Sequence, residues 1–155
     1  LYSSAASDVY KRQTLSLLRK PELWVYSNIE TGSVPYASAE STFNRISITE
    51  RSKLKAELTS NYSGQISSST NKQSNPGDSD STNEYIAITI LVATKKDLSL
   101  QNSANTEVIT EALRILGSIS SNDLIALEVI WQPDAEGETL REEELIIQYP
   151  NLKHL

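Results

Sequence analysis

The stretch LIALEVIWQPDAEGETLREEEL, residues 124–145, joins an apolar run to a cluster of acids. Side chains alternate between the two faces of a strand, so its first part can place Ile125 and Leu127 on one face and Leu124 and Ala126 on the other. Further on, the T-x-x-E form of a capping box starts at Thr139. The stretch therefore predicts a strand over 124–131, followed by a helix over 140–149 with Thr139 as its N-cap.

The acids of this stretch fall into two groups. Glu142, Glu143 and Glu144 lie in the first turn of the predicted helix, where the helix dipole stabilises each carboxylate by about 0.3–1 kcal/mol. Asp134, Glu136 and Glu138 precede it in a loop around Gly137. A calcium loop needs D-x-[DN]-x-[DN]-G with a later Glu, and DAEGET does not have that order. No metal site is predicted here.

Glu128 lies inside the predicted strand, between Leu127 and Val129. A carboxylate is costly to bury without a partner, and a buried one can have a raised pKa and act as an acid. The alternative, which we favour, is a face that is partly exposed or paired with a Lys or Thr of the neighbouring strand, near Thr89. A metal-dependent or acid–base hydrolase using Glu128 and the 134–144 carboxylates, Asp134 and Glu136 first, is kept as a second hypothesis.

Two further strands and three helices extend this pattern. EYIAITILVAT, from Glu84, alternates with one fully apolar face, which is typical of a central strand over 85–93. Residues 106–116 have helical spacing and end at Gly117. A strand, a helix and a strand joined by short segments imply a crossover, right-handed if the strands are parallel neighbours. Aromatic and β-branched residues predict a strand over 23–29.

Helical spacing also begins at Tyr36, and Ser47-Ile48-Thr49-Glu50 has the form of a capping box. These patterns predict a helix that ends near Ile46 and a second helix from Ile48 to about Asn61. The predicted fold is α+β: a small sheet of about three strands (23–29, 85–93 and 124–131), with helices packed on it and a long polar loop.

The chain divides by composition into four segments. LYSSAASDVYKRQ, residues 1–13, resembles a translated sequencing adapter and is predicted to be non-native. Residues 14–62 form a helical half with one short strand. Residues 63–83 are rich in Ser, Thr and Asn, and we expect a disordered linker or loop. Residues 84–155 form a strand–helix–strand–helix half of the same domain.

Composition excludes several kinds of function. The net charge of −6 disfavours a nucleic acid partner. There is no Cys, so thiolate chemistry and disulfides are excluded. The single His154 lies in a tail, where a catalytic imidazole is seldom held in place. No motif for a nucleotide or another cofactor occurs, and we predict no catalytic residue and no cofactor. The longest apolar run, YIAITILVA, has the length of a strand rather than of a membrane span.

An aromatic cluster suggests an interaction surface. Trp is enriched at protein–protein hot spots, although a Trp more often packs in a core. Trp24, Val25 and Tyr26, with Asn28 beside them, are the predicted partner-binding surface.

Five strings carry a family resemblance: LRKPELWVYSN, SAESTFNRISITERSK, EYIAITILVAT, EVIWQPDAEGETL and YPNLK. Together they resemble the domain-of-unknown-function 1517 family of cyanobacteria and plastids. The resemblance implies no established enzymatic activity and no cofactor. It also implies a preceding hydrophobic segment that tethers the whole protein to a cyanobacterial or chloroplast membrane, near photosynthesis and light acclimation.

We therefore predict a non-enzymatic interaction or regulatory domain with a protein partner at a photosynthetic membrane. Membrane contact would come only through the N-terminal segment missing here, and the fragment itself would be soluble. A soluble adaptor that docks through residues 63–83 is a further alternative.

Overall fold

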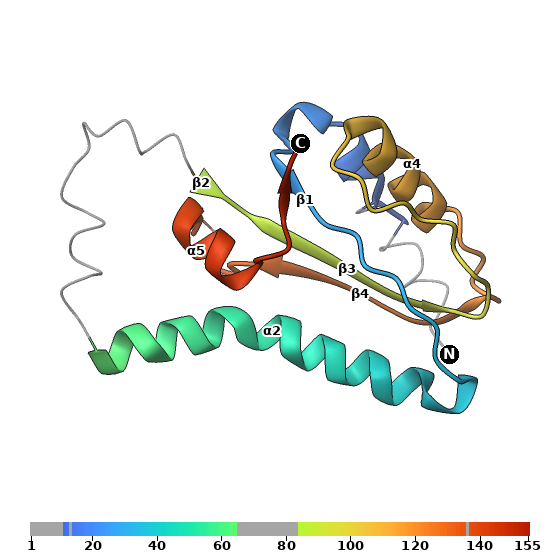
Figure 1. The fold of residues 1–155 in the computed structure, drawn as a ribbon, viewed down its shortest axis with the longest axis horizontal. Coiled ribbons are helices and arrows are strands. Elements are labelled where there is room, and N and C mark those ends of the chain that lie inside the picture. Colours follow the sequence, from blue (N-terminus) through green and yellow to red (C-terminus); the bar gives the residue numbers. More distant parts are fainter. Residues whose placement is uncertain (1–10, 13, 65–83, 136) are drawn as a thin grey trace. The chain divides into compact units, whose positions relative to one another are not determined.

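The computed structural model describes residues 11–12, 14–64, 84–135 and 137–155, and its fold is α+β as predicted (Figure 1). The described chain opens with helical residues, at 11–12 and 14–18. The remaining elements are η1 (Pro21–Leu23), β1 (Tyr26–Ser27), η2 (Tyr36–Ser38), α2 (Ala39–Gly64), β2 (Glu84–Tyr85), β3 (Ala87–Thr94), α4 (Thr106–Gly117), β4 (Leu124–Gln132), β5 (Leu140–Arg141), α5 (Glu142–Gln148) and β6 (Lys153–His154).

The two long strands, β3 and β4, pair side by side and run in opposite directions (Figure 1). At one end of the pair, the Lys95 backbone N–H donates to the Asp123 carbonyl at 2.8 Å. The strands therefore do not form the parallel crossover unit that the strand–helix–strand order suggested. Instead, α4 lies within a long connection that leaves β3 and returns to β4 at the same end of the pair.

In the part of the chain that the structure describes, the strands form three two-stranded sheets rather than the single sheet of about three strands predicted. β1 pairs antiparallel with β6, with Tyr26 opposite His154. The predicted strand over 23–29 shrinks to two residues because η1 occupies its start and β6 offers a partner only two residues long. β2 pairs antiparallel with β5, with Tyr85 opposite Leu140.

The chain divides into two compact units, which we call the first and the second unit. The first comprises Leu1–Ile46, Ile90–Val129 and Asn151–Leu155, and the second comprises Ser47–Thr89 and Ile130–Pro150. In the first unit, Ile119, Leu124 and Leu127 form a buried cluster, against which Ile90, Val92, Leu98, Leu116 and Val129 pack. In the second, Leu140 and Leu145 are the most buried apolar side chains among those that the structure describes.

The helix break predicted near Ile46 does not exist, because α2 is continuous from Ala39 to Gly64. Ala39, Phe43 and Ser47 are buried at a spacing of four residues, so Ser47 continues one face of the helix. A capping box requires its first residue to lie outside the helix, and this one does not. The predicted loop over 63–83 loses its first two residues to α2.

Two segments of the sequence prediction lie largely or wholly outside the described residues. These are residues 65–83 of the loop, and residues 1–10 and 13 of the segment predicted to be non-native. Both therefore stay predictions, as does the division of the chain into halves of one domain.

The last helix begins later than predicted, and Thr139 is not its N-cap. Leu140 is drawn into the β2–β5 pair and is only 2% exposed, so it cannot serve as the first helical residue. Arg141 is the N-cap, and the Glu144 carboxylate accepts from the Arg141 backbone N–H at 3.3 Å and from its Nε at 3.0 Å. Glu142, Glu143 and Glu144 do occupy the first turn, as predicted.

The corrected cap predicts which of two substitutions destabilises the protein. Thr139→Ala should change the free energy of unfolding by less than about 0.5 kcal/mol, because Thr139 is exposed outside the helix. Glu144→Ala should cost about 1–3 kcal/mol, because it removes an acceptor of two donors at the helix start. Urea unfolding measures both values. Glu143→Ala is the control, because Glu143 is an exposed acid in the same turn. An equal or larger loss in Thr139→Ala would restore Thr139 as the cap.

Candidate functional site

A shallow groove in the first unit lies between the segment 99–101 and α4. Its volume is about 200 Å³. Pockets for whole cofactors or drug-sized ligands are commonly about 300–1,000 Å³, so this groove is smaller than such pockets. Its lining combines apolar Leu100, Val108, Ala112 and Ile115 with polar Ser99, Gln101, Glu107 and Glu111.

The helix α4 supplies most of the groove through a wide apolar face. Val108, Ala112 and Ile115 follow the i, i+4, i+7 spacing of one helical stripe and line the groove. The adjacent stripe includes Leu113, which is buried, and Leu116, which packs against the cluster around Leu124. One half of the apolar face therefore holds the helix on the core, and the other half is left to form a concave surface.

The start of α4 is fixed by a side-chain cap. The Asn105 Oδ1 accepts from the Glu107 backbone N–H at 2.8 Å, which satisfies one of the free donors of the first turn. Asn105 is a residue type favoured at this position because its short side chain bends back to the backbone. The cap sets where Glu107 and the groove begin.

Two acids stand at the edge of this groove. Glu107 and Glu111 are exposed and lie four residues apart, on the same side of α4. Glu111 is 3.9 Å from the Arg114 guanidinium, but the two side chains are 64% and 68% exposed. An exposed pair at that distance contributes about 0–1 kcal/mol, so it does not fix the position of the Glu111 carboxylate.

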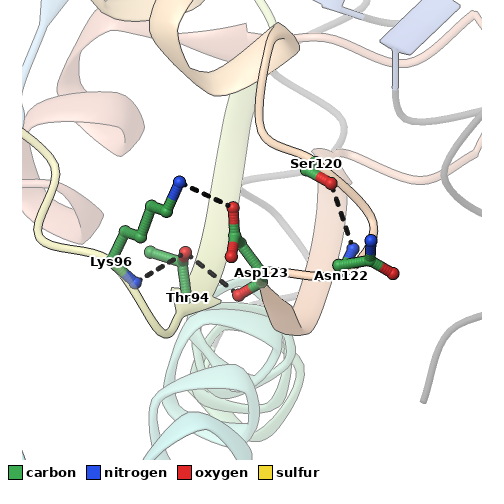
Figure 2. A network of polar contacts seen from close by, with 5 residues as sticks. All are labelled: Thr94, Lys96, Ser120, Asn122 and Asp123. Carbon is green, nitrogen blue, oxygen red and sulfur yellow. Dashed lines mark hydrogen bonds and ion pairs between the residues drawn. The ribbon is translucent and has the colours of Figure 1, made fainter.

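A polar network closes the end of β3 and β4 from which the groove segment departs (Figure 2). The Thr94 hydroxyl donates to the Asp123 carbonyl at 3.1 Å and accepts from the Lys96 backbone N–H at 3.3 Å. Lys96 Nζ lies 3.3 Å from the Asp123 carboxylate, and Ser120 Oγ accepts from the Asn122 backbone N–H. The network ties the residues that follow β3 to those that precede β4.

The predicted partner-binding surface lies in the first unit and is only partly exposed. Trp24, Val25, Tyr26 and Asn28 are all half-buried. The Val25 carbonyl accepts from the Leu155 backbone N–H at 2.9 Å, and the Tyr26 ring meets the His154 ring edge-on at a centroid distance of 5.1 Å. These contacts give the stretch a role in holding the C-terminus, while its role in binding a partner stays a prediction.

The acids of the hydrolase hypothesis are distributed over both units. Glu128 is half-buried in β4 of the first unit and has interaction partners. Asp134 is exposed in the second unit, and Glu136 lies outside the described residues. Within the described residues, no group of three or more His, Asp or Glu side chains is arranged to hold a metal ion. The hydrolase hypothesis stays a sequence prediction.

The second unit contains a buried polar cluster that sequence reasoning did not identify. Gln132 is only 5% exposed, and its Nε2 donates to the Glu50 carbonyl at 2.9 Å. Lys53 Nζ is 2.8 Å from a Glu50 carboxylate oxygen and 4.4 Å from the centre of the Tyr149 ring. The helix α2 is thereby linked to the end of β4 and to the C-cap of α5.

Two buried polar atoms of this cluster, the Gln132 Oε1 and the Tyr149 hydroxyl, lack a partner of good hydrogen-bond geometry. Burial, and to a smaller extent the charge of Glu50, raise the pKa of Tyr149 from 10.0 to about 12, although the nearby Thr89 hydroxyl partly offsets them. Tyr149 is consequently neutral at physiological pH. The cluster is a structural link with unused hydrogen-bonding capacity.

The groove acids were also missed from the sequence, although a signal was present. In the stretch TEVITEAL, from Thr106, each of two acids four residues apart is followed by an apolar residue, Val108 or Ala112. That pattern places a charged edge beside an apolar stripe on one helix. It does not show that the preceding segment folds back to make the other wall.

The described structure has an α+β fold that contains an antiparallel pair of long strands. The chain belongs to the family described as "Protein of unknown function (DUF1517)", which matches residues 3–155. This confirms the resemblance found in the sequence. No solved structure matches the chain significantly.

Two curated proteins are similar to the chain over almost its whole length. It is 37% identical over 156 residues to "Protein FLAP1 homolog A" of Synechocystis, covering 97% of this chain and 47% of that protein. It is 36% identical over 151 residues to "FLUCTUATING-LIGHT-ACCLIMATION protein 1, chloroplastic" of Arabidopsis thaliana, covering 96% of this chain and 38% of that protein. The chain thus spans less than half the length of either relative.

The network in Figure 2 predicts that the Thr94 hydroxyl contributes more to stability than the ion pair between Lys96 and Asp123. Thr94→Val should lower the free energy of unfolding by about 1–2 kcal/mol, because it removes two hydrogen bonds to backbone groups. Lys96→Ala should cost less than about 0.5 kcal/mol, because Lys96 is 75% exposed. Urea unfolding compares the two, and a larger loss in Lys96→Ala would contradict this ranking.

Tyr149 predicts a difference in stability at alkaline pH. Its pKa is raised from 10.0 to about 12 on folding, so the unfolded chain ionises first and the protein loses stability as the pH rises from 10 through 12. Tyr149→Phe removes this ionisation, so its free energy of unfolding should fall less between pH 9 and pH 12 than that of the unchanged protein. Chemical unfolding at each pH measures this difference.

The same substitution gives an internal control at neutral pH. Removing a buried hydroxyl that lacks a well-placed partner should leave the stability at pH 7 unchanged or slightly higher. A loss above about 1 kcal/mol would show that the hydroxyl has a strong partner. Parallel pH profiles for the two proteins would contradict the raised pKa.

Proposed function

We propose that this chain is a non-enzymatic interaction domain that serves light acclimation at a photosynthetic membrane. Its family is of unknown function, and one similar protein is named for acclimation to fluctuating light and is chloroplastic, while the other is named as a homologue from Synechocystis. These names support a photosynthetic setting. The interaction role is supported by the surface of the domain itself.

The groove on α4 is the observation that carries the interaction role. It offers an apolar floor at the surface, and its volume of about 200 Å³ suits a side chain of another protein better than a whole cofactor. Concave apolar sites with a few polar groups at the edge are where partners place their anchoring residues. The size and the lining of the groove support the proposal that the domain recognises a segment of another protein.

Contact with the membrane is proposed to come through a segment N-terminal to this domain. The chain covers less than half of each similar protein, so the whole proteins contain further sequence that can supply such a segment. Within the described residues, none of the helices combines the length and the apolar character needed to cross a membrane. In this proposal the domain is the part that meets protein partners at the membrane surface.

Site-specific photo-cross-linking tests the proposed function. We expect p-benzoylphenylalanine in place of Gln101, which is exposed at the groove, to capture one discrete protein from purified cyanobacterial thylakoid membranes. Mass spectrometry identifies that protein, and an excess of the unmodified chain should compete with its capture. The readout is the cross-linked band and its peptides.

The matched control carries the same photoreactive residue in place of Glu30, which is exposed and does not line the groove. The captured protein should be absent from this control. Equal capture from both positions, or no capture from Gln101, would overturn the groove as the surface that binds a protein of the thylakoid membrane.

A further inference from the structure

We propose that the groove on α4 recognises an arginine side chain in a segment of a partner protein. The inference rests on the proposed function, because it names the chemistry of the partner at the same site. Its basis is the combination of an apolar floor with two acids on one edge, together with a volume that admits one long side chain. Each of these features selects among the residue types that the groove can hold.

The floor of the groove favours a side chain with a long apolar stem. Leu100, Val108 and Ile115 present aliphatic carbon, and Ala112 between them is small enough to leave the surface concave. Arginine and lysine bury their methylene stems along such surfaces while the charged head stays at the edge. A short acidic or amide side chain would not cover this floor.

The edge of the groove then favours a cation. Glu107 and Glu111 stand one helical turn apart, and Glu111 holds Arg114 only through a long, exposed contact of 3.9 Å. A cation from a partner can therefore contact both carboxylates, and only the weak pair between Glu111 and Arg114 is lost. The net charge of −6 adds a general attraction for a basic segment.

Arginine fits this arrangement better than lysine. Its planar guanidinium presents five donors and can engage a carboxylate through two parallel hydrogen bonds, whereas an ammonium is a compact, strongly hydrated charge. Gln101, at the opposite wall, adds a polar group near the head. Arginine is also among the residues that most often anchor protein interfaces.

Peptide titration of the intact chain tests the proposal. The probe is a short acetylated and amidated peptide in which one Arg is flanked by Leu and Ala, and amide chemical shifts of the labelled protein are followed by NMR. A single anchor should bind with a dissociation constant on the order of millimolar. We expect the shifts to centre on Leu100, Glu107 and Glu111. Replacing Arg by citrulline, a neutral analogue of the same shape, should weaken binding about tenfold.

Two matched protein variants separate the groove from general charge. Combining Glu107→Gln with Glu111→Gln should lower the affinity for the Arg peptide by about tenfold or more, because charge-assisted hydrogen bonds are lost. Combining Glu30→Gln with Glu40→Gln removes the same charge from exposed sites that do not line the groove and should leave binding within about twofold. Equal affinity in both variants, or shifts away from the groove, would overturn the proposal.

The remaining outcomes separate this inference from the proposed function. Peptide binding at the groove without a cross-linked membrane protein would retain the arginine site and reject the proposed function. A cross-linked protein whose capture is unchanged in the Glu107 and Glu111 variant would retain the proposed function and reject the arginine site. A dimer of the chain that is lost in that variant, measured by sedimentation, would assign the groove to a second copy and overturn the inference of a separate partner.

Discussion

The backbone ladder between β3 and β4 is the constraint that fixes both ends of the segment carrying the candidate site. It joins parts of the chain that are 29 positions apart at Thr94 and Asp123, and it is the one long strand pair in the described part of the chain. Because the strands are antiparallel, everything between them must leave and return at one end. The segment that carries α4 is therefore anchored at both ends by the same few residues. The Thr94 hydroxyl reinforces that point because it bonds to backbone on both sides.

Local patterns predicted the elements of this ladder well and its direction poorly. The strand expected over 85–93 differs from β3 by two residues at its start and one at its end. The strand expected over 124–131 starts with β4 and is short by one residue, and the helix over 106–116 is α4 short by one residue. Alternation and helical spacing are local properties, so they can be read directly. Whether two strands run parallel depends on how the connection between them folds, and no local residue pattern records that choice. The same limit hid β6, whose two residues have strand geometry only because β1 is beside them.

The two capping motifs show why a correct chemical rule can be applied at the wrong residue. Ser47 and Thr139 each head a sequence that fits the capping box, yet neither caps a helix. Ser47 is small enough to lie on the buried face of α2, so the helix has no reason to stop there. Leu140 is withdrawn by pairing with Tyr85, which moves the N-cap to Arg141 and makes Glu144 the residue that reaches back. In both places a tertiary contact outweighed about 1 kcal/mol of local preference.

The acids differ in whether the start of a helix already stabilises their negative charge. This difference explains why the candidate site could not be found from the sequence. The carboxylates at the start of α5 lie in its first turn, where the helix dipole stabilises them, and Glu107 has the same advantage in the first turn of α4. Glu111 lies beyond that turn, where the dipole no longer helps, and its contact with Arg114 is long and exposed. In the linear sequence the acids of 134–144 looked more functional because they are denser. In the structure the sparse pair on α4 is the one that borders an apolar hollow, because the segment 99–101 folds back beside it.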